Sequence, residues 1–252
     1  MIDLHSHILP GLDDGASCLE DSLSLIRNSI NDDVTHILAT PHIHFGTFDN
    51  DMVSIKTAFN SLCEYIDNHG VSINLAYAAE IRISPEIIQL VEQKQIPFMG
   101  KYEGADIMLL EFPHSHILPG SEKLIDWLIK KNIKPMIAHP ERNRDVWKYP
   151  EAMQPFIKRN CLLQITASSL LGDFGERSKK HAWSYIESGD ATIVASDMHN
   201  LKRRPNKMKE AYNLVQKRFG LEVADSLFIN TPQKIIETNP TLQLAKALAY
   251  AY

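Results

Sequence analysis

The sequence predicts an α/β fold in which parallel strands form a barrel and helices cover its outside. Seven short apolar runs recur along the chain, and amphipathic stretches of helix length separate them. Such alternation of strand and helix is typical of a parallel sheet. His, Asp or Glu closely follows six of the runs. Because an open sheet concentrates its site at one switch point, ligand-like residues on nearly every strand favour a closed barrel.

The elements are expected in the following order. Strands are expected near residues 2–6, 36–40, 73–80, 107–112, 134–138, 162–166 and 192–196. The first helix follows Ser17-Cys18-Leu19-Glu20, which has the pattern of a capping box, and its inward residues are Leu23, Ile26 and Ile30. A second is capped by Ser121 and turns four residues inward, Leu124, Ile125, Leu128 and Ile129. A third stops at Gly220, and its apolar spacing is set by Met208, Tyr212, Val215 and Phe219.

Length and composition fit one globular domain over residues 1–252, with 242–252 as an Ala-rich tail. The formal net charge of -5 argues against a nucleic-acid binder. The scattered cysteines Cys18, Cys63 and Cys161 form no CxxC pair, which argues against a disulfide framework or a zinc ribbon. The first strand begins at once, with no room for a signal peptide, and no apolar run reaches the roughly 18 residues of a membrane helix. We therefore expect a cytoplasmic protein without membrane insertion.

Nine side chains that bind metals well lie at strand ends or, in one case, in the turn of residues 11–15. They are His5, His7, Asp14, His42, Glu80, Glu111, His139, Asp197 and His199. Residues two apart in a strand face the same way. His5 and His7 therefore present one pair of ligands, and Asp197 and His199 present another. One such pair is commonly chance, but two pairs with four further ligands predict a metal site. Mixed His and carboxylate ligands suit Mn²⁺, Zn²⁺ or Fe²⁺.

Several strings of residues resemble a known superfamily. Asp3 to His7, Ala138 to Asn143 and Ser196 to Asn200 are similar to the polymerase and histidinol phosphatase (PHP) superfamily, whose fold is a distorted (β/α)7 TIM-like barrel with up to three metals. Longer strings narrow the resemblance to the metal-dependent bacterial protein-tyrosine phosphatases of capsule and exopolysaccharide loci. These are His7 to Gly15, Ala39 to His42, Glu80 to Arg82, Leu110 to Pro113 and His139 to Arg144. The resemblance runs from residue 1 to about residue 238.

The resemblance implies roles for individual residues. One metal would be held by His5, His7, Glu80 and Asp197. Glu80 would bridge to a second metal, completed by Glu111 and His139, and a third would be held by Asp14, His42 and His199. Arg142 and Arg204 would bind phosphate, with Arg203 as an alternative to Arg204. The three divalent ions are expected to be Mn²⁺, with Fe²⁺, Zn²⁺ or Mg²⁺ as alternatives.

The charges suit phosphate chemistry. Four carboxylates bring about -4 and three divalent ions about +6, so the site would attract a phosphate dianion. The ions would also lower the pKa of a bound water, and the resulting hydroxide would attack phosphorus directly. The proton donor stays open among Asp13, Asp14 and His44. By the resemblance, the substrate is phosphotyrosine on the tyrosine-rich tail of a bacterial kinase that controls polysaccharide export.

Other interpretations remain at this point. Arg142 would pair with Glu141 or Asp145 on the surface, and Glu111 would be a buried ion-pair partner. The loop histidines His44, His114 and His116 would be rim residues or simply solvated. No cysteine is followed six positions later by Arg, which argues against thiolate phosphatase chemistry. The rival functions are a small-molecule phosphomonoesterase, such as histidinol-phosphate phosphatase, and a non-catalytic metal-binding regulator.

Overall fold

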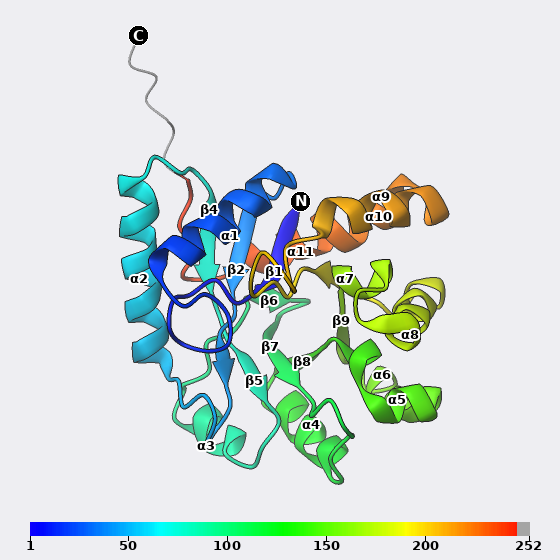
Figure 1. The fold of residues 1–252 in the computed structure, drawn as a ribbon. Helices are drawn as coiled ribbons and strands as arrows, with labels where there is room; N and C mark the ends of the chain where they lie inside the picture. The colour runs from blue at the N-terminus through cyan, green and yellow to red at the C-terminus, as the bar shows by residue number, and fades with distance from the viewer. Residues whose placement is uncertain (246–252) are drawn as a thin grey trace.

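The computed structural model describes residues 1–245, with strands in the middle of the molecule and helices around them (Figure 1). The strands are β1 (Ile2–Ser6), β2 (His36–Ala39), β3 (His42–Ile43), β4 (Asn74–Tyr77), β5 (Glu80–Arg82), β6 (Lys101–Tyr102), β7 (Ala105–Glu111), β8 (Ile133–Ala138), β9 (Leu162–Thr166) and β10 (Ile193–Ala195). The α-helices are α1 (Leu19–Asn31), α2 (Met52–Asn68), α3 (Ile87–Glu92), α4 (Ser121–Lys130), α5 (Arg144–Lys148), α6 (Gln154–Ile157), α7 (Ala167–Leu171), α8 (Gly175–Glu187), α9 (Met208–Phe219), α10 (Leu221–Asp225) and α11 (Thr231–Ile236).

Two of the barrel strands are interrupted. β4, β2 and β1 pair in parallel, and β10, β9, β8, β7, β5 and β3 form a second parallel series. The pairs β2–β4 and β3–β5 keep one register, since His36 faces Asn74 and His42 faces Glu80. β3 and β5 therefore continue β2 and β4 beyond a break, where Pro41 has no N–H to give to a ladder.

A bridge between Ser6 and Met198 joins β1 to the segment that leaves β10 and closes the ring. The predicted distorted barrel of seven strands is confirmed, with the run expected near 73–80 split between β4 and β5. The short β6 pairs antiparallel with β7 and has no counterpart among the predicted runs.

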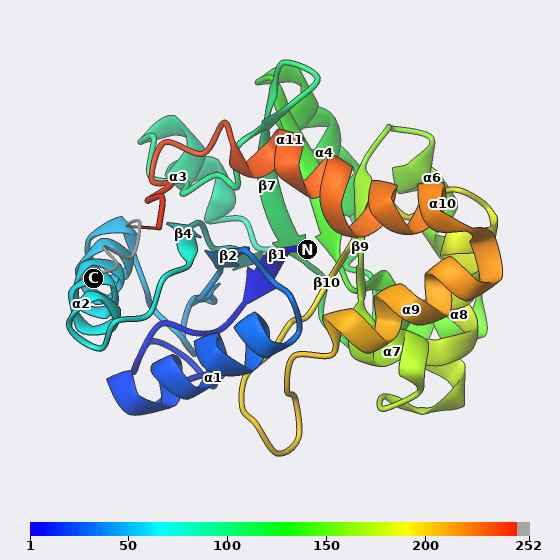
Figure 2. The same cartoon turned by 90° about the horizontal axis from the view of Figure 1, so that it is seen from above.

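Apolar side chains from every barrel strand fill the interior of the barrel. This cluster includes Ile2, Leu4, Leu38, Ala76, Ile107, Leu109, Met136, Ala138, Leu162 and Ile193. Ile235 and Ile236 of α11 belong to it, and α11 crosses the amino-terminal end of the strands (Figure 2). A Cβ on Gly100 would lie 2.1 Å from the carbonyl oxygen of Ile235, so only glycine allows this approach. The interior is thus closed at one end, and a site can open only at the carboxyl ends of the strands.

The first predicted helix forms, but its expected start is wrong. α1 begins at Leu19 after Cys18, which makes no side-chain cap. Ser17 instead donates its N–H and its hydroxyl to Asp21, one position beyond the Glu20 of the expected capping box. Leu23 and Ile26 are buried as predicted, whereas Ile30 is 37% exposed because it lies at the end of the apolar face.

The two other predicted helices are α4 and α9. Ser121 opens α4 but does not cap it, because the residue before the helix is Gly120 and the Ser121 hydroxyl donates to the carbonyl of Leu118. Ile125 and Leu128 are buried, while Ile129 is 40% exposed and was wrongly placed inward. α9 spans the predicted apolar residues and ends at Gly220, as predicted.

No helix within residues 1–245 is long and apolar enough to cross a membrane. Within the predicted tail, Gln243 forms an antiparallel bridge with Leu75 of β4. The rest of the tail from residue 246 onward lies outside the described residues.

Candidate metal centre

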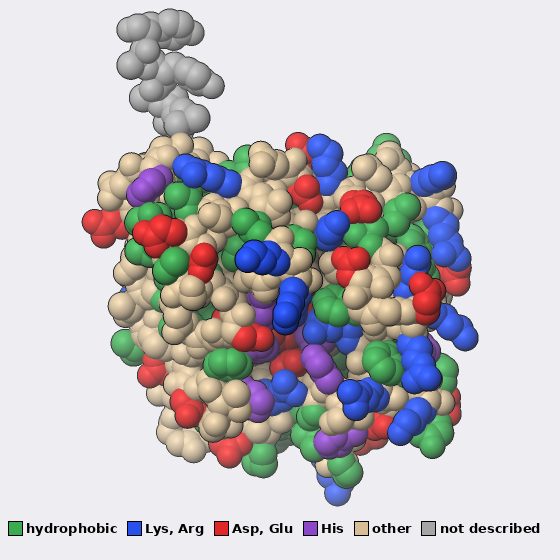
Figure 3. Space-filling model, viewed as in Figure 1, with side chains coloured by type: hydrophobic (Ala, Val, Ile, Leu, Met, Phe, Trp, Pro, Cys, Tyr) green, Lys and Arg blue, Asp and Glu red, His purple; other side chains and the backbone are tan. Residues whose placement is uncertain are grey.

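The nine candidate ligands meet at the carboxyl ends of the barrel strands. Histidine and acidic side chains lie in a hollow in the middle of the face shown in Figure 3, with Lys and Arg side chains around them. The ring of His7 lies 3.8 Å from that of His199 and 4.6 Å from that of His42, measured between centroids. Eight of the nine are buried, and only the side chain of Asp14 is about half exposed, at 53%. Barrel closure therefore brings all nine together.

The first group of ligand atoms comprises His5, His7, Glu80 and Asp197. Nε2 of His5 lies 3.2 Å from Nε2 of His7, 3.3 Å from Glu80 Oε2 and 3.4 Å from Asp197 Oδ1. Nε2 of His7 lies 3.4 Å from each of the same two oxygens. Atoms at the corners of a tetrahedron with such edges lie about 2.0 Å from its centre, close to the length of a zinc–nitrogen bond. These four side chains fit a divalent transition-metal ion.

The second group is Glu111, His114 and His139. Oε1 of Glu111 lies 3.9 Å from His114 Nδ1 and 3.9 Å from His139 Nε2. Nε2 of His139 also lies 2.8 Å from Glu80 Oε1, so the two oxygens of Glu80 face different groups. The sequence leaves His114 open between a rim residue and a solvated loop residue. In the structure it lies at the rim, with Nδ1 near Glu111 and Nε2 accepting from Arg142. Because an imidazole that accepts at Nε2 carries its hydrogen on Nδ1, the predicted set stays Glu80, Glu111 and His139.

The third group is His7, Asp14, His42 and His199. Oδ1 of Asp14 lies 3.3 Å from His199 Nε2 and 3.5 Å from His42 Nε2. The other ring nitrogen of His42, Nδ1, lies 3.0 Å from Glu80 Oε2 and 3.8 Å from Glu111 Oε2. His42 therefore stands between the second and third groups with one nitrogen toward each. A further group, His42, Glu80 and Glu111, links these three, so the ligand atoms form one connected cluster.

Five buried atoms of this cluster have no hydrogen-bond partner within residues 1–245. They are His42 Nδ1, Glu80 Oε2, Glu111 Oε2, Asp197 Oδ1 and His199 Nε2. Buried polar atoms without partners are rare and costly, and each calls for an explanation. All five belong to predicted ligands, and each lies within 3.0–3.4 Å of an atom of another predicted ligand or, for Glu111 Oε2, of the Arg82 guanidinium. This is the arrangement of ligand atoms that face shared cations, so the residues present fit the metals.

The charges of the cluster favour added cations. Burial and the charge of Glu80 raise the pKa of Glu111 to about 7. Burial and the charge of Arg142 lower the pKa of His139 to about 3, which leaves this imidazole neutral and free to bind metal. Burial alone would lower the pKa of His42, but the charge of Glu80 and a hydrogen bond with Asp14 raise it to about 10. The crowded carboxylates thus attract positive charge, which divalent ions would supply.

Two candidate ligands depend on unusual backbone conformations. His139 and Asp197 have φ of 34° and 51°, in the left-handed region that residues other than glycine seldom adopt. Each follows the end of a barrel strand, β8 or β10, where the chain turns. A third special position is Gly15, where a Cβ would lie 2.1 Å from the carbonyl oxygen of His7. This close approach holds the turn that carries Asp13 and Asp14 against the cluster.

Two buried partners orient the histidines of the first group. His5 Nδ1 donates to Gln164 Oε1 at 2.9 Å, and His7 Nδ1 donates to Asp13 Oδ2 at 2.7 Å. Each bond leaves Nε2 facing the cluster, the usual arrangement of metal-binding imidazoles. Although burial would raise the pKa of Asp13, its bond with His7 lowers it to about 2. Asp13 therefore holds the His7 ring as a carboxylate. For the partner of His5, the signal available in the sequence was a polar Gln164 in an otherwise apolar strand.

The two predicted phosphate-binding arginines both reach the cluster. Arg142 and Arg204 each donate to Oδ2 of Asp197, whose other oxygen belongs to the first group. Arg142 also donates to His114 Nε2 at 3.1 Å and stacks over the ring of Phe174. The side chain of Arg203 is exposed and makes no such contact among the described residues.

The surface pairing considered for Arg142 does not form. Glu141 is buried, and it accepts from the N–H of Thr166 and the hydroxyl of Ser169. Asp145 accepts from the N–H of Ile117.

The other candidate residues lie outside the site. His44 and His116 belong to none of the three groups. The backbone of His44 pairs with Phe48, and the ring of His116 bonds with Ser115. Burial raises the pKa of Cys63 to about 11 and that of Cys161 to about 12, which disfavours a thiolate at either.

Arg82 contacts the predicted ligand Glu111, and the sequence analysis does not predict this ion pair. Its Nη2 lies 3.0 Å from Glu111 Oε2, and its Nε is buried without a partner among the described residues. The alternative that Glu111 is a buried ion-pair partner is thus realised, while Oε1 of Glu111 still faces His139. A signal was present, since Arg82 lies two positions after Glu80 in one strand and so shares its direction.

We expect Arg82→Gln to weaken metal binding because Glu111 loses the guanidinium that holds its carboxylate. Loss of an outer partner of a ligand typically costs roughly 10-fold or more in affinity. Mn²⁺ titration with counting of bound ions measures the effect. Arg159→Gln, which breaks a surface pair with Asp126, is the matched control. Equal Mn²⁺ affinity in the two variants would show that Arg82 does not support Glu111.

A family model and curated relatives place this chain in the same family. Residues 1–237 match the family described as capsular polysaccharide synthesis, CpsB/CapC. The tyrosine-protein phosphatase YwqE of Bacillus subtilis is 34% identical over 225 residues, covering 88% of this chain and 87% of that protein. The putative tyrosine-protein phosphatase CapC of Staphylococcus aureus is 33% identical over 239 residues, covering 95% and 92%.

Solved structures agree with the sequence matches. A structure from the work on YwqE of Bacillus subtilis and CpsB of Streptococcus pneumoniae, described as unique metal-dependent tyrosine phosphatases, superposes with a TM-score of 0.87 at 30% identity. It covers 98% of this chain and 99% of its own. A β-aspartyl dipeptidase superposes with a TM-score of 0.59 at 15% identity, a likeness of fold alone. By sequence and by structure, this chain belongs to the CpsB/CapC family.

Proposed function

We propose that this protein is a metal-dependent protein-tyrosine phosphatase that hydrolyses phosphotyrosine. The observation that carries the proposal is one carboxylate, Asp197, that joins the metal cluster to two guanidinium groups. Its Oδ1 faces His5 and His7, and its Oδ2 accepts from Arg142 and Arg204. The arginines are thereby fixed at the edge of the ligand cluster, with further N–H groups left for an anion. The family membership and the names of the relatives point the same way.

The proposed cofactors are three divalent ions, held by the three groups, with Mn²⁺ first among the alternatives Fe²⁺, Zn²⁺ and Mg²⁺. When bound, such ions lower the pKa of water and neutralise phosphate charge. The chain's own residues do the rest. Gln164 and Asp13 orient the imidazoles, and the fork-shaped guanidiniums of Arg142 and Arg204 suit phosphate oxygens that no metal holds. Electrostatic stabilisation of this kind is commonly the largest catalytic contribution.

Partly exposed aromatic rings favour an aryl phosphate over histidinol phosphate. Phe48 stacks on the ligand His42 with ring centroids 5.4 Å apart and planes 7° apart. The guanidinium of Arg142 lies over the ring of Phe174, with its central carbon 4.4 Å from the centroid of that ring. Both rings offer apolar surface next to the cluster, which a phenyl ring can cover. A small hydroxylated amine would gain less from that contact.

The proposed substrate protein is a bacterial tyrosine kinase with a tyrosine-rich tail that controls capsular or exopolysaccharide synthesis. Support comes from the match to a capsular polysaccharide synthesis family and from relatives that are tyrosine-protein phosphatases. We further propose a cytoplasmic location, and a single domain over residues 1–252 with 242–252 as its tail.

The test compares two substrates with the same enzyme. Purified protein should hydrolyse a phosphotyrosyl peptide, lose that activity after chelation and regain it with Mn²⁺. Histidinol phosphate should be turned over far more slowly. A preference for histidinol phosphate would favour the small-molecule phosphatase instead. Metal-loaded protein that hydrolyses neither phosphoester would favour the non-catalytic regulator.

A further inference from the structure

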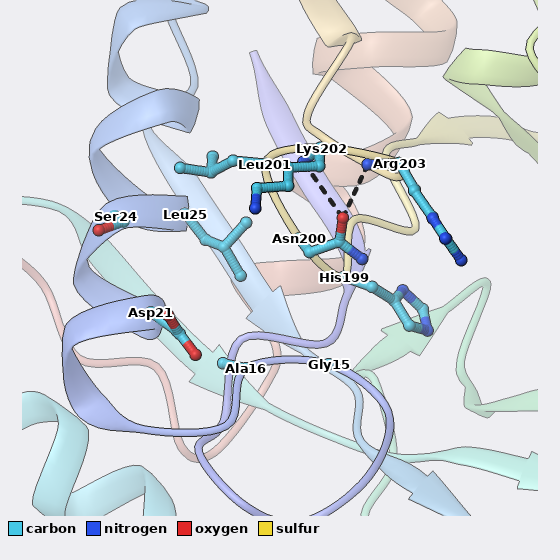
Figure 4. A pocket seen from close by; sticks show the side chains of 10 residues that line it. All are labelled: Gly15, Ala16, Asp21, Ser24, Leu25, His199, Asn200, Leu201, Lys202 and Arg203. Atoms are coloured by element: carbon cyan, nitrogen blue, oxygen red, sulfur yellow. Dashed lines mark hydrogen bonds between the residues drawn. The ribbon is translucent and has the colours of Figure 1, made fainter.

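A pocket of about 530 Å³ opens beside the metal centre, between α1 and the loop of residues 199–204 (Figure 4). His199, a member of the third ligand group, lines it, and so does Gly15, which follows the ligand Asp14. Leu25 and Asp21 of α1 face the loop across the pocket. The pocket therefore shares a wall with the metal cluster. Neither Arg142 nor Arg204 lines it.

The loop has a fixed shape that divides its basic residues. The side-chain oxygen of Asn200 accepts the backbone N–H groups of Lys202 and Arg203, at 3.2 and 2.8 Å. The N–H of His199 donates to the carbonyl of Arg204 at 2.9 Å, which closes the turn. The side chain of Arg204 therefore donates to Asp197 in the cluster, while Lys202 and Arg203 line the pocket.

The charges of the pocket are unbalanced. Lys202 and Arg203 are exposed, and within residues 1–245 neither side chain makes a hydrogen bond or an ion pair. The acidic group on the opposite wall, Asp21, already accepts the N–H and the hydroxyl of Ser17. Two unpaired cations therefore outnumber the one carboxylate of a pocket that shares His199 with the cluster. The whole chain carries a net charge of -5, so this basic pocket contrasts with the average charge of the protein.

We propose that the pocket binds an acidic side chain of the substrate near its phosphotyrosine. The proposal rests on the proposed function, because it places the phosphate in the cluster next door. An extended peptide advances about 3.3 Å per residue, so a residue within about three positions of the phosphotyrosine reaches a neighbouring pocket. Leu25 and Leu201 offer apolar contact to the methylene groups of Glu, while Lys202, which points toward α1, meets its carboxylate (Figure 4). The guanidinium of Arg203 points to the other side of the loop and adds positive charge nearby.

The experiment uses two phosphotyrosyl peptides that differ only in flanking Glu or Gln residues, together with para-nitrophenyl phosphate. We expect the wild-type enzyme to favour the Glu peptide by roughly fivefold in kcat/KM, the size expected of two exposed ion pairs. The difference should reside in KM and should fade as ionic strength rises to about 0.5 M, since salt screens exposed charges. Lys202→Gln/Arg203→Gln should remove the preference and leave hydrolysis of para-nitrophenyl phosphate within about twofold.

The control is Lys217→Gln/Arg218→Gln, which removes an adjacent Lys-Arg pair at the end of α9, outside the pocket. It changes the net charge equally and should keep the preference. The proposal is overturned if the wild-type enzyme treats both peptides alike, or if the Lys202→Gln/Arg203→Gln variant still favours the Glu peptide. It is also overturned if that variant loses activity on para-nitrophenyl phosphate in parallel, because the loop would then act only through Arg204. Failure to hydrolyse any phosphotyrosyl substrate would instead remove the proposed function.

Discussion

Glu80→Ala should abolish phosphatase activity and strip more metal than any other single ligand change. The reason is that Glu80 Oε2 lies 3.3 Å from His5 Nε2 and 3.0 Å from His42 Nδ1, while Oε1 lies 2.8 Å from His139 Nε2. One carboxylate thus faces all three groups. Its loss removes ligands to two ions and also leaves the imidazoles around it without a counter-charge. We expect activity to fall by roughly 10³-fold or more, since water activation depends on the bound ions.

Asp14→Ala is the comparison, because Asp14 faces only the third group and is about half exposed. Metal bound per protein after dialysis should be lower in Glu80→Ala than in Asp14→Ala. Glu103→Ala, which breaks a surface pair with Lys134, controls for loss of a carboxylate and should retain full metal content. Circular dichroism establishes that each variant is folded. Equal metal content in Glu80→Ala and Asp14→Ala would show that Glu80 does not bridge.

Arg142→Ala should lower kcat by roughly 10²-fold, comparable to the loss of one charge-stabilising donor in other enzymes. Arg142 is 9% exposed, and its guanidinium is held between Asp197, His114 and the ring of Phe174. A group fixed so firmly meets the phosphoryl oxygens without reorganisation, which is why its removal is expected to affect kcat more than KM. Arg142→Lys should recover only part of the loss, because an ammonium cannot reproduce the two-pronged contact.

Metal content separates a catalytic role from a structural one. Arg142 supplies no metal-binding atom, and Arg204 still holds Oδ2 of Asp197 when Arg142 is removed, so Arg142→Ala should keep far more metal than Glu80→Ala. Arg159→Ala, which removes a surface pair with Asp126 and a hydrogen bond to the carbonyl of Pro155, should keep normal kinetics. An Arg142→Ala enzyme with wild-type kcat and KM on a phosphotyrosyl peptide would remove Arg142 from the site and leave Arg204 as the remaining candidate.

Much of the fold could be read from short-range patterns. The apolar runs and the helix-length stretches between them are local features, and they predicted the strands and the closed barrel. The errors concern helix caps and the edges of apolar helix faces, where a single residue decides the local structure. Ser17 bonds to Asp21 rather than serving the expected capping box, and Gly120 takes the cap position expected for Ser121. Ile30 and Ile129 follow the helical period but lie at the edges of their apolar faces, where neighbours no longer cover them.

By itself, the sequence determined which side chains were available as ligands, because residues that follow parallel strands must meet at one end of a barrel. Tertiary structure decided which atoms face one another. His114 joins Glu111 and His139, and Arg82 reaches Glu111, although no sequence spacing requires either contact. The bond between His5 and Gln164 spans 159 positions, and the pocket beside His199 exists only where α1 packs against a distant loop. Such contacts depend on which side chains the closed ring brings within reach of one another and on left-handed turns at its rim, and no local pattern encodes either.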